Sequence, residues 1–187
     1  MRVTSGSARG VPLRSPKRPG VRPTMDRVRS GLFSILTPVG IKGAVVADLF
    51  AGSGSLGIEA LSRDAAHAEF VEVDSRQCAD IQANLEATKL RDRATVYTMR
   101  AEQALEVLHG PYDLVLMDPP YSQPFPAYVV EQLEARGLLR EDAKVVVGHA
   151  TRDSSPERCG GLVRWDDRRY GDSSLAFYRH SRPEVDA

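Results

Sequence analysis

Residues 44–57 read AVVADLFAGSGSLG, an apolar run that leads directly into a glycine-rich turn. Gly52, Gly54 and Gly57 stand at the spacing G-x-G-x-x-G, and residues 56–63 have the pattern of a helix. Glycine lets a backbone turn sharply and lets a ligand approach it closely. The stretch therefore predicts a buried strand, a ligand-binding turn and a helix.

The flanking sequence continues this alternation. Further strands are expected at 69–73, 94–99, 112–117 and 144–148, and helices at 25–36, 75–87, 102–108 and 127–135. Such regular alternation is typical of a parallel sheet covered by helices. The last two strands, 162–166 and 174–178, are joined through residues 168–172 without a helix, which indicates an antiparallel hairpin. The sequence thus predicts an α/β fold with a mostly parallel seven-stranded sheet and an antiparallel C-terminal hairpin.

Two acidic residues follow the first two strands. Glu72 lies twenty residues after Gly52, where a carboxylate can accept hydrogen bonds from ribose hydroxyls. Asp48 precedes the turn, where its charge disfavours a pyrophosphate and favours the ammonium of a methionine moiety. This argues against a nicotinamide-dependent oxidoreductase, which the glycine spacing alone would also fit. Val73 is expected to cover an adenine or to pack in the core, and Asp74 to cap the next helix.

The fourth strand leads into Asp118-Pro119-Pro120-Tyr121. Two prolines make the loop stiff, so the Asp118 carboxylate and the Pro119 carbonyl become two fixed acceptors. The exocyclic amine of a nucleobase offers two N–H donors, and holding both would aim its lone pair at the methyl group of a sulfonium. Tyr121 would stack on the base. These four residues are therefore the predicted catalytic residues.

Positive charge is concentrated at the start of the chain. Residues 1–30 hold eight basic residues against one acidic residue, a net charge of +7, so the remainder carries −7. We expect residues 1–23 to form a basic arm and residues 24–187 a single domain, with Thr24 as the N-cap of the helix at 25–36. The arm suits RNA or is a solvated tail. The candidate RNA-binding residues are Arg2, Arg9, Arg14, Lys17, Arg18 and Arg22.

The remaining composition indicates a cytoplasmic protein. Cys78 and Cys159 lack metal-type spacing, so we expect two free thiols and no metal. No apolar run has the length of a membrane span, and no signal-peptide core is present. Heptads are absent, so a monomer is expected.

Taken together, these residues resemble those of the bacterial methyltransferases that act on the N2 amino group of guanine 966 in 16S ribosomal RNA. The likeness covers nearly the whole chain. The segments that carry it are Met1-Arg2-Val3, Arg22-Pro23-Thr24, Asp26-Arg27-Val28, the stretch 48–60, Asp118-Pro119-Pro120-Tyr121 and Tyr170-Gly171-Asp172. The glycine turn and the Asp-Pro-Pro-Tyr loop occur in many amino-methyltransferases, and Arg22-Pro23-Thr24 narrows the match.

The resemblance implies a Rossmann-like class I methyltransferase with S-adenosyl-L-methionine as cofactor. It implies that 16S RNA is the substrate, within the small ribosomal subunit or an assembly intermediate. The cofactor-binding residues that it implies, together with those argued above, are Arg22, Thr24, Asp48, Phe50, Ala51, Gly52, Ser53, Gly54, Glu72, Val73, Ala101 and Asp118.

One position departs from the family pattern. Related sequences often place Asp or Asn after the third strand to accept the adenine amino group, and Arg100 stands there. Arginine cannot accept a hydrogen bond, so Glu102 or the backbone of Ala101 would read the adenine.

His149, after the fifth strand, is expected to be packed or solvated. The alternatives to the RNA enzyme are a DNA adenine-N6 methyltransferase and a non-catalytic RNA-binding factor in ribosome assembly.

Overall fold

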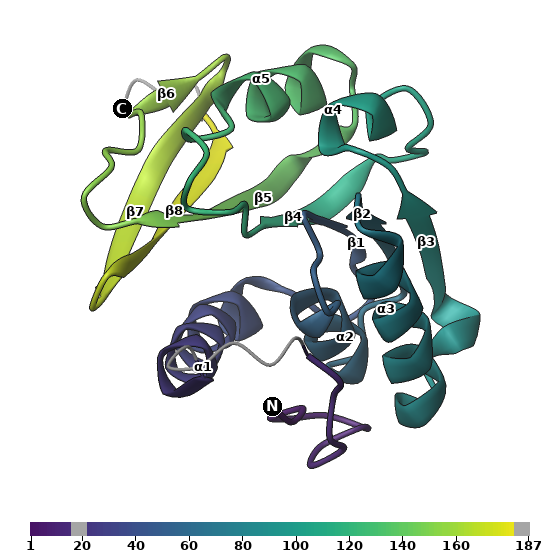
Figure 1. Cartoon of the computed structure of the whole chain (residues 1–187). Helices are drawn as coiled ribbons and strands as arrows, with labels where there is room; N and C mark the ends of the chain where they lie inside the picture. The colour runs from purple at the N-terminus through teal and green to yellow at the C-terminus, as the bar shows by residue number, and fades with distance from the viewer. Residues whose placement is uncertain (16–21, 182–187) are drawn as a thin grey trace.

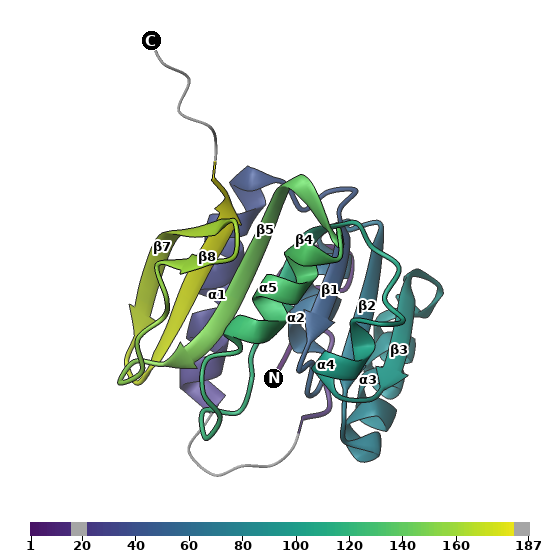
Figure 2. The same cartoon turned by 90° about the horizontal axis from the view of Figure 1, so that it is seen from above.

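The computed structural model describes residues 1–15 and 22–181, without the side chains of residues 22–27. Within these residues, eight strands form one sheet in the order β3-β2-β1-β4-β5-β8-β7-β6 (Figures 1 and 2). The strands are β1 (Val45–Leu49), β2 (His67–Glu72), β3 (Ala94–Thr98), β4 (Tyr112–Met117), β5 (Leu139–Ala150), β6 (Arg158–Cys159), β7 (Leu162–Tyr170) and β8 (Ser173–His180). The first five are parallel, and β8 pairs antiparallel with β5.

Helices cover both faces of the sheet. They are α1 (Arg22–Val39), α2 (Ser55–Ser62), α3 (Ser75–Thr88), α4 (Ala101–Ala104) and α5 (Ala127–Ala135), with a short 3-10 helix η1 (Arg91–Arg93). Figure 1 shows α1, α2 and α3 on one face and α4 and α5 on the other. The strand order reverses between β1 and β4, and in open sheets this switch point creates a crevice for ligands at the carboxyl ends of the strands.

The predicted α/β class, the mostly parallel sheet and the C-terminal hairpin are confirmed. The predicted number of seven strands is wrong by one, because β6 has two residues and is too short to show a periodic pattern. The cap predicted at Thr24 is also wrong, since α1 already begins at Arg22. Asp74 caps α3 as predicted, because its side chain accepts a hydrogen bond from the Arg76 N–H at 2.8 Å.

Residues 1–15, here called the N-terminal strap, lie against the α2 side of the sheet. Val3, Ala8 and Leu13 are buried in the same core cluster as the α2 residues. Gly6 has a φ of +80°, and a Cβ there would lie 1.6 Å from the Ser62 carbonyl oxygen. Part of the expected basic arm therefore packs into the core, with its backbone pressed onto α2.

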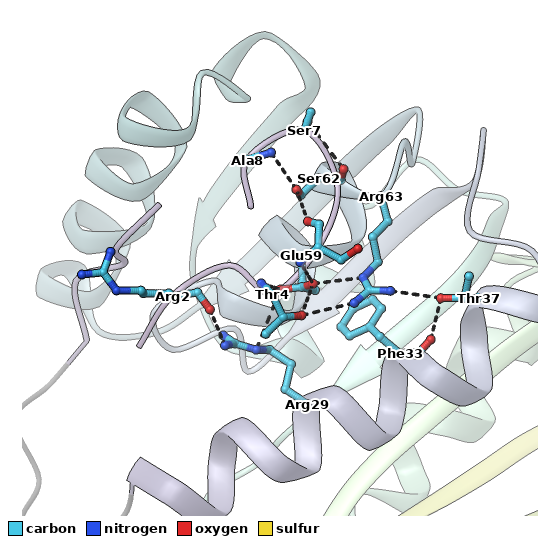
Figure 3. A network of polar contacts seen from close by, with 11 residues as sticks. Arg2, Thr4, Ser7, Ala8, Arg29, Phe33, Thr37, Glu59, Ser62 and Arg63 are labelled. Carbon is cyan, nitrogen blue, oxygen red and sulfur yellow. Dashed lines mark hydrogen bonds and ion pairs between the residues drawn. The ribbon is translucent and has the colours of Figure 1, made fainter. Parts of the chain in front are cut away.

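The buried carboxylate of Glu59 in α2 holds this strap in place (Figure 3). Thr4 donates to it from its N–H at 2.8 Å and from Oγ1 at 2.5 Å, and the Ser5 N–H donates at 3.0 Å. Arg63 donates from Nε at 3.0 Å, and the Arg29 Nε lies 3.9 Å away. Since Arg29 belongs to α1, one carboxylate joins the strap, α1 and α2.

We predict that Glu59→Ala destabilises the protein strongly. Two arginines would lose the anion that compensates their charge, and removing one partner of a buried ion pair typically costs about 3–5 kcal/mol. Urea denaturation should show the loss as a lower midpoint. Glu86→Ala, an exposed substitution in α3, is the matched control and should change the midpoint little. Equal midpoints for the two variants would contradict this account of the strap.

Candidate active site

The glycine turn between β1 and α2 adopts backbone conformations that side chains disfavour. Gly52 and Gly54 have φ values of +57° and +74°, and Phe50 has a φ of +63°. Gly57 is required for a different reason, because a Cβ there would lie 2.4 Å from the Phe70 ring. Each glycine of the predicted motif thus has a geometric role.

Glu72 ends β2 beside this turn. Its Oε2 accepts a hydrogen bond from the Gly52 N–H at 2.8 Å, and Oε1 accepts one from the Asp74 N–H at 2.8 Å. Each carboxylate oxygen has a further lone pair, so Glu72 can also accept from hydroxyl groups of a ligand. The next residue, Val73, is 59% exposed and presents an apolar side chain at the same edge.

The segment before α4 completes this end of the crevice. The Met99 N–H donates to the Glu72 carbonyl at 3.0 Å, which places the start of α4 beside the end of β2. Ala101 opens α4 and is buried. Arg100, the residue that departs from the family pattern, immediately precedes the helix and is exposed.

Asp48 lies at the end of β1, beneath the glycine turn. It is 1% exposed, and its Oδ2 accepts a hydrogen bond from the Gly57 N–H at 2.8 Å. Burial, together with the negative charges of Asp118 and Glu72, raises the pKa of Asp48 to about 8, against the opposing effect of the hydrogen bond from the Gly57 N–H. Its observed contact fixes the start of α2, and a cation in the crevice would favour its ionised form.

Asp118 lines a cavity with an empty volume of about 560 Å³. Asp118 is exposed to solvent as a residue, but the protein atoms packed around its carboxyl group bury that group in part. This burial raises the pKa of Asp118 to about 6, and a hydrogen bond with Tyr121 opposes the rise. Gly148 in β5 makes room for it, because a Cβ there would lie 2.5 Å from the Asp118 Oδ1. The acid is therefore mostly ionised at neutral pH and faces an open space.

The predicted site residues fall into three groups. The structure brings together, at one edge of the sheet, residues 48–54, Glu72, Val73, Ala101 and the loop 118–121. Lys17 and Arg18 lie outside the described residues, as do the side chains of Arg22 and Thr24. Arg2, Arg9 and Arg14 are exposed on the strap.

Sequence reasoning missed several walls of the cavity. Val28 and Leu32 of α1 line it, as do Ser173 and Leu175 of β8. Apolar residues at helix or strand spacing indicate burial without identifying a ligand cavity. The Tyr170-Gly171-Asp172 segment was the nearest available signal, since it precedes Ser173.

Asn84 in α3 was missed as well. Its Nδ2 donates to the carbonyls of Ser53 and Arg14, at 2.9 and 3.0 Å, and its Oδ1 accepts from the Arg14 N–H at 2.7 Å. One buried side chain therefore ties the glycine turn to the strap.

His149 is packed, as expected. It is buried, its Nδ1 lies 3.0 Å from the Asp153 carbonyl, and Phe125 meets its ring edge-on at 6.0 Å between centroids. Cys78 and Cys159 are free and buried. Across residues 1–15 and 22–181, no group of acids, histidines or cysteines is arranged to hold a metal ion, and no helix is long and apolar enough to cross a membrane.

We predict that Asp48 makes the folded state less stable as pH rises. Its pKa is about 8 when folded and near 4 when unfolded, so the folded protein binds the extra proton between these values. The contribution is full below pH 4 and is lost towards pH 8, by at most about 1.4 kcal/mol per pH unit. Asp48→Asn keeps an acceptor for Gly57 and should remove this slope. Parallel pH profiles of unfolding free energy for variant and wild type would contradict the assignment.

Sequence comparisons match this chain to known proteins over nearly its whole length. The family described as Conserved hypothetical protein 95 matches residues 1–179. Ribosomal RNA small subunit methyltransferase D of Escherichia coli is 38% identical over 188 aligned residues, which cover 100% of this chain and 94% of that protein.

Solved structures also superpose on most of this chain. A conserved hypothetical protein from Streptococcus pyogenes superposes with a TM-score of 0.77 at 37% identity, covering 82% of this chain and 95% of that one. A Thermus thermophilus hypothetical protein gives a TM-score of 0.78 at 29% identity, covering 96% and 99% of the two chains. The fold is the Rossmann-like class I methyltransferase fold. The chain belongs to the family of the ribosomal RNA small subunit methyltransferase D proteins.

Proposed function

We propose that this protein transfers a methyl group from S-adenosyl-L-methionine to the exocyclic N2 amino group of a guanine in 16S ribosomal RNA, at guanine 966. The observation that carries the proposal is the position of the Asp118 carboxyl group, which follows β4 and lines a cavity. The whole-length similarity to a ribosomal RNA methyltransferase supports the RNA class of the substrate.

The residues around the glycine turn fit this cofactor. Gly52 is partly exposed in the turn, Glu72 keeps lone pairs for ribose hydroxyls, and the exposed Val73 can cover an adenine. The cofactor supplies an electrophilic methyl group on a sulfonium cation. Asp48 would offset the positive charge of the bound cofactor, and that charge would lower the raised pKa of Asp48.

The Asp-Pro-Pro-Tyr loop positions the amine. Asp118 and the Pro119 carbonyl would accept hydrogen bonds from the two N–H groups of the amine, so that the nitrogen lone pair would point at the methyl group. As the bond from the nitrogen to the methyl carbon forms, the bond from that carbon to the sulfonium sulfur would break and leave a neutral thioether. Asp118 would stabilise the positive charge that develops on the nitrogen. Tyr121 is partly exposed and stacks on the guanine. The proton then leaves to Asp118 or to water.

The strap supplies part of the RNA contact. Arg2, Arg9 and Arg14 are exposed there, while the strap backbone is fixed by α2 and α3. Fixed cations lose less freedom on binding phosphates than cations on a flexible tail do. The substrate is 16S RNA within the small subunit or an assembly intermediate.

Glu72→Ala should weaken cofactor binding about tenfold or more, because a hydrogen bond from a ligand to a charged acceptor contributes roughly 1.5–3 kcal/mol. Isothermal titration calorimetry with S-adenosyl-L-methionine measures this directly. Glu86→Ala on the outside of α3 serves as the control. An unchanged dissociation constant for Glu72→Ala would remove this residue from the pocket.

Asp118 should be needed for methyl transfer but not for cofactor binding. Asparagine keeps the shape and one acceptor oxygen but loses the charge, and alanine loses both. We expect the single-turnover rate on small ribosomal subunits to fall in the order wild type, Asp118→Asn, Asp118→Ala, with a total loss on the order of a hundredfold or more. The wild-type rate should also fall as the pH drops through about 6, where Asp118 takes up a proton.

The same assay separates the competing functions. Methyl transfer to adenine in a DNA duplex, without transfer to ribosomal RNA, would favour the DNA enzyme. RNA binding without any methyl transfer would favour a non-catalytic assembly factor. The catalytic role would be falsified if Asp118→Ala transferred methyl groups at the wild-type rate.

A further inference from the structure

Two arginines beyond the Asp-Pro-Pro-Tyr loop lie at the same edge of the sheet. Arg152 follows the end of β5, and Arg169 lies near the end of β7. Figure 2 shows the arrows of β5 and β7 pointing the same way, so both strands end at this edge. The Thr151 N–H donates to the Asp172 carbonyl at 2.9 Å, which joins the segment after β5 to the turn between β7 and β8.

Strand register places Arg169 on the face of the sheet that carries α5. Arg169 pairs with Ser174 across β7 and β8, and Ser174 pairs with His149 across β8 and β5. Directly paired residues in antiparallel strands project to the same face. His149 packs against Phe125 on that face, so Arg169 projects to the side where the loop after Asp118 runs.

Both guanidinium groups remain available to an anion. The Arg152 side chain is 77% exposed; its Nη2 lies 3.4 Å from the Tyr121 carbonyl, and its contact with Asp153 is loose at 3.8 Å. Arg169 is exposed and donates from Nε to the Gly171 carbonyl at 3.2 Å, and it has no ion pair within the described part of the chain. By contrast, Arg168 is held by Asp166 at 2.8 Å.

A shallow second hollow lies beside Arg152, which contacts two of its lining residues, Tyr121 and Asp153. Its walls also include Gln123, Phe125 and His149. Tyr121 also lines the cavity that contains Asp118, so the hollow and that cavity meet at this residue. Aromatic and amide side chains beside cations are the combination that holds unpaired RNA bases and their phosphates.

We propose that Arg152 and Arg169 bind the phosphates of the RNA strand next to the target guanine, with an unpaired neighbouring base lying over this second hollow. This inference rests on the proposed function, because it assumes an RNA substrate whose target base reaches Asp118. The contact positions the strand, since phosphate contacts fix register without reading sequence. It assigns the C-terminal hairpin a role in substrate binding in addition to its place at the sheet edge.

The test compares two double variants with the same change in net charge. Arg152→Ala/Arg169→Ala removes the proposed contacts. Arg136→Ala/Arg140→Ala removes two arginines at the opposite edge, where they pair with Glu106 and Asp113 on the surface. For each protein, binding to a 16S RNA fragment is titrated at several salt concentrations, cofactor binding is measured by calorimetry, and single-turnover methylation is followed at saturating RNA.

We expect the first variant to bind the fragment about tenfold or more weakly, and the slope of log affinity against log salt to flatten by about two. Its cofactor affinity and its rate at saturating RNA should match the wild type, and the control should bind RNA as the wild type does. Unchanged RNA affinity in the first variant, or an equal loss in the control, would overturn the inference. Methylation by the wild type reports separately on the proposed function, since the binding titration does not depend on catalysis.

Discussion

The arrangement of the strap, α1 and α2 depends on one constraint, which is that the buried negative charge of Glu59 must be compensated. A carboxylate with no exposed surface is costly unless hydrogen bonds and an opposite charge surround it. Here the compensation comes from two residues of the strap and from arginines of α1 and α2. Segments that are far apart in the sequence must therefore meet at one point, and α1 is held where it can form a wall of the cavity.

A second electrostatic constraint acts at the carboxyl edge. Asp48, Glu72 and Asp118 end neighbouring strands, so three acidic groups gather around one crevice. Their mutual repulsion contributes to the raised pKa of Asp48. Such a site costs stability without a ligand and favours a ligand that carries positive charge. The crevice is therefore matched to a sulfonium and an ammonium, and mismatched to the pyrophosphate of a dinucleotide.

Much of the fold and the centre of the site could be predicted from local sequence patterns. The bounds predicted for β4 and α5 agree with the structure, since both have clear apolar patterns next to proline or glycine. The glycine turn, Glu72 and the Asp118 loop were predictable because each is a short segment placed directly after a strand.

What escaped prediction depends on long-range contacts. The strap was expected as an arm because its composition is polar, yet Val3, Ala8 and Leu13 pack into the core at a spacing that is typical of neither a helix nor a strand. Asn84 looked like an ordinary helix residue, and its three hydrogen bonds follow only from the positions of the strap and the glycine turn around it. Arg152 and Arg169 likewise come together through the register of β5, β8 and β7, which no single segment encodes.

The sequence suggests that the basic residues at the start of the chain form a separate arm, but part of that segment is packed on the folded domain. Zero net charge conceals a basic start, but the strap is held on the α1–α3 face of the sheet. Arg169 projects from the opposite face, and the Asp118 loop lies at the edge between the two. An RNA strand that crosses this edge would meet cations on both sides of the reacting base. Attraction from both faces would centre the strand on Tyr121, whereas a flexible basic tail would raise the affinity without fixing the register.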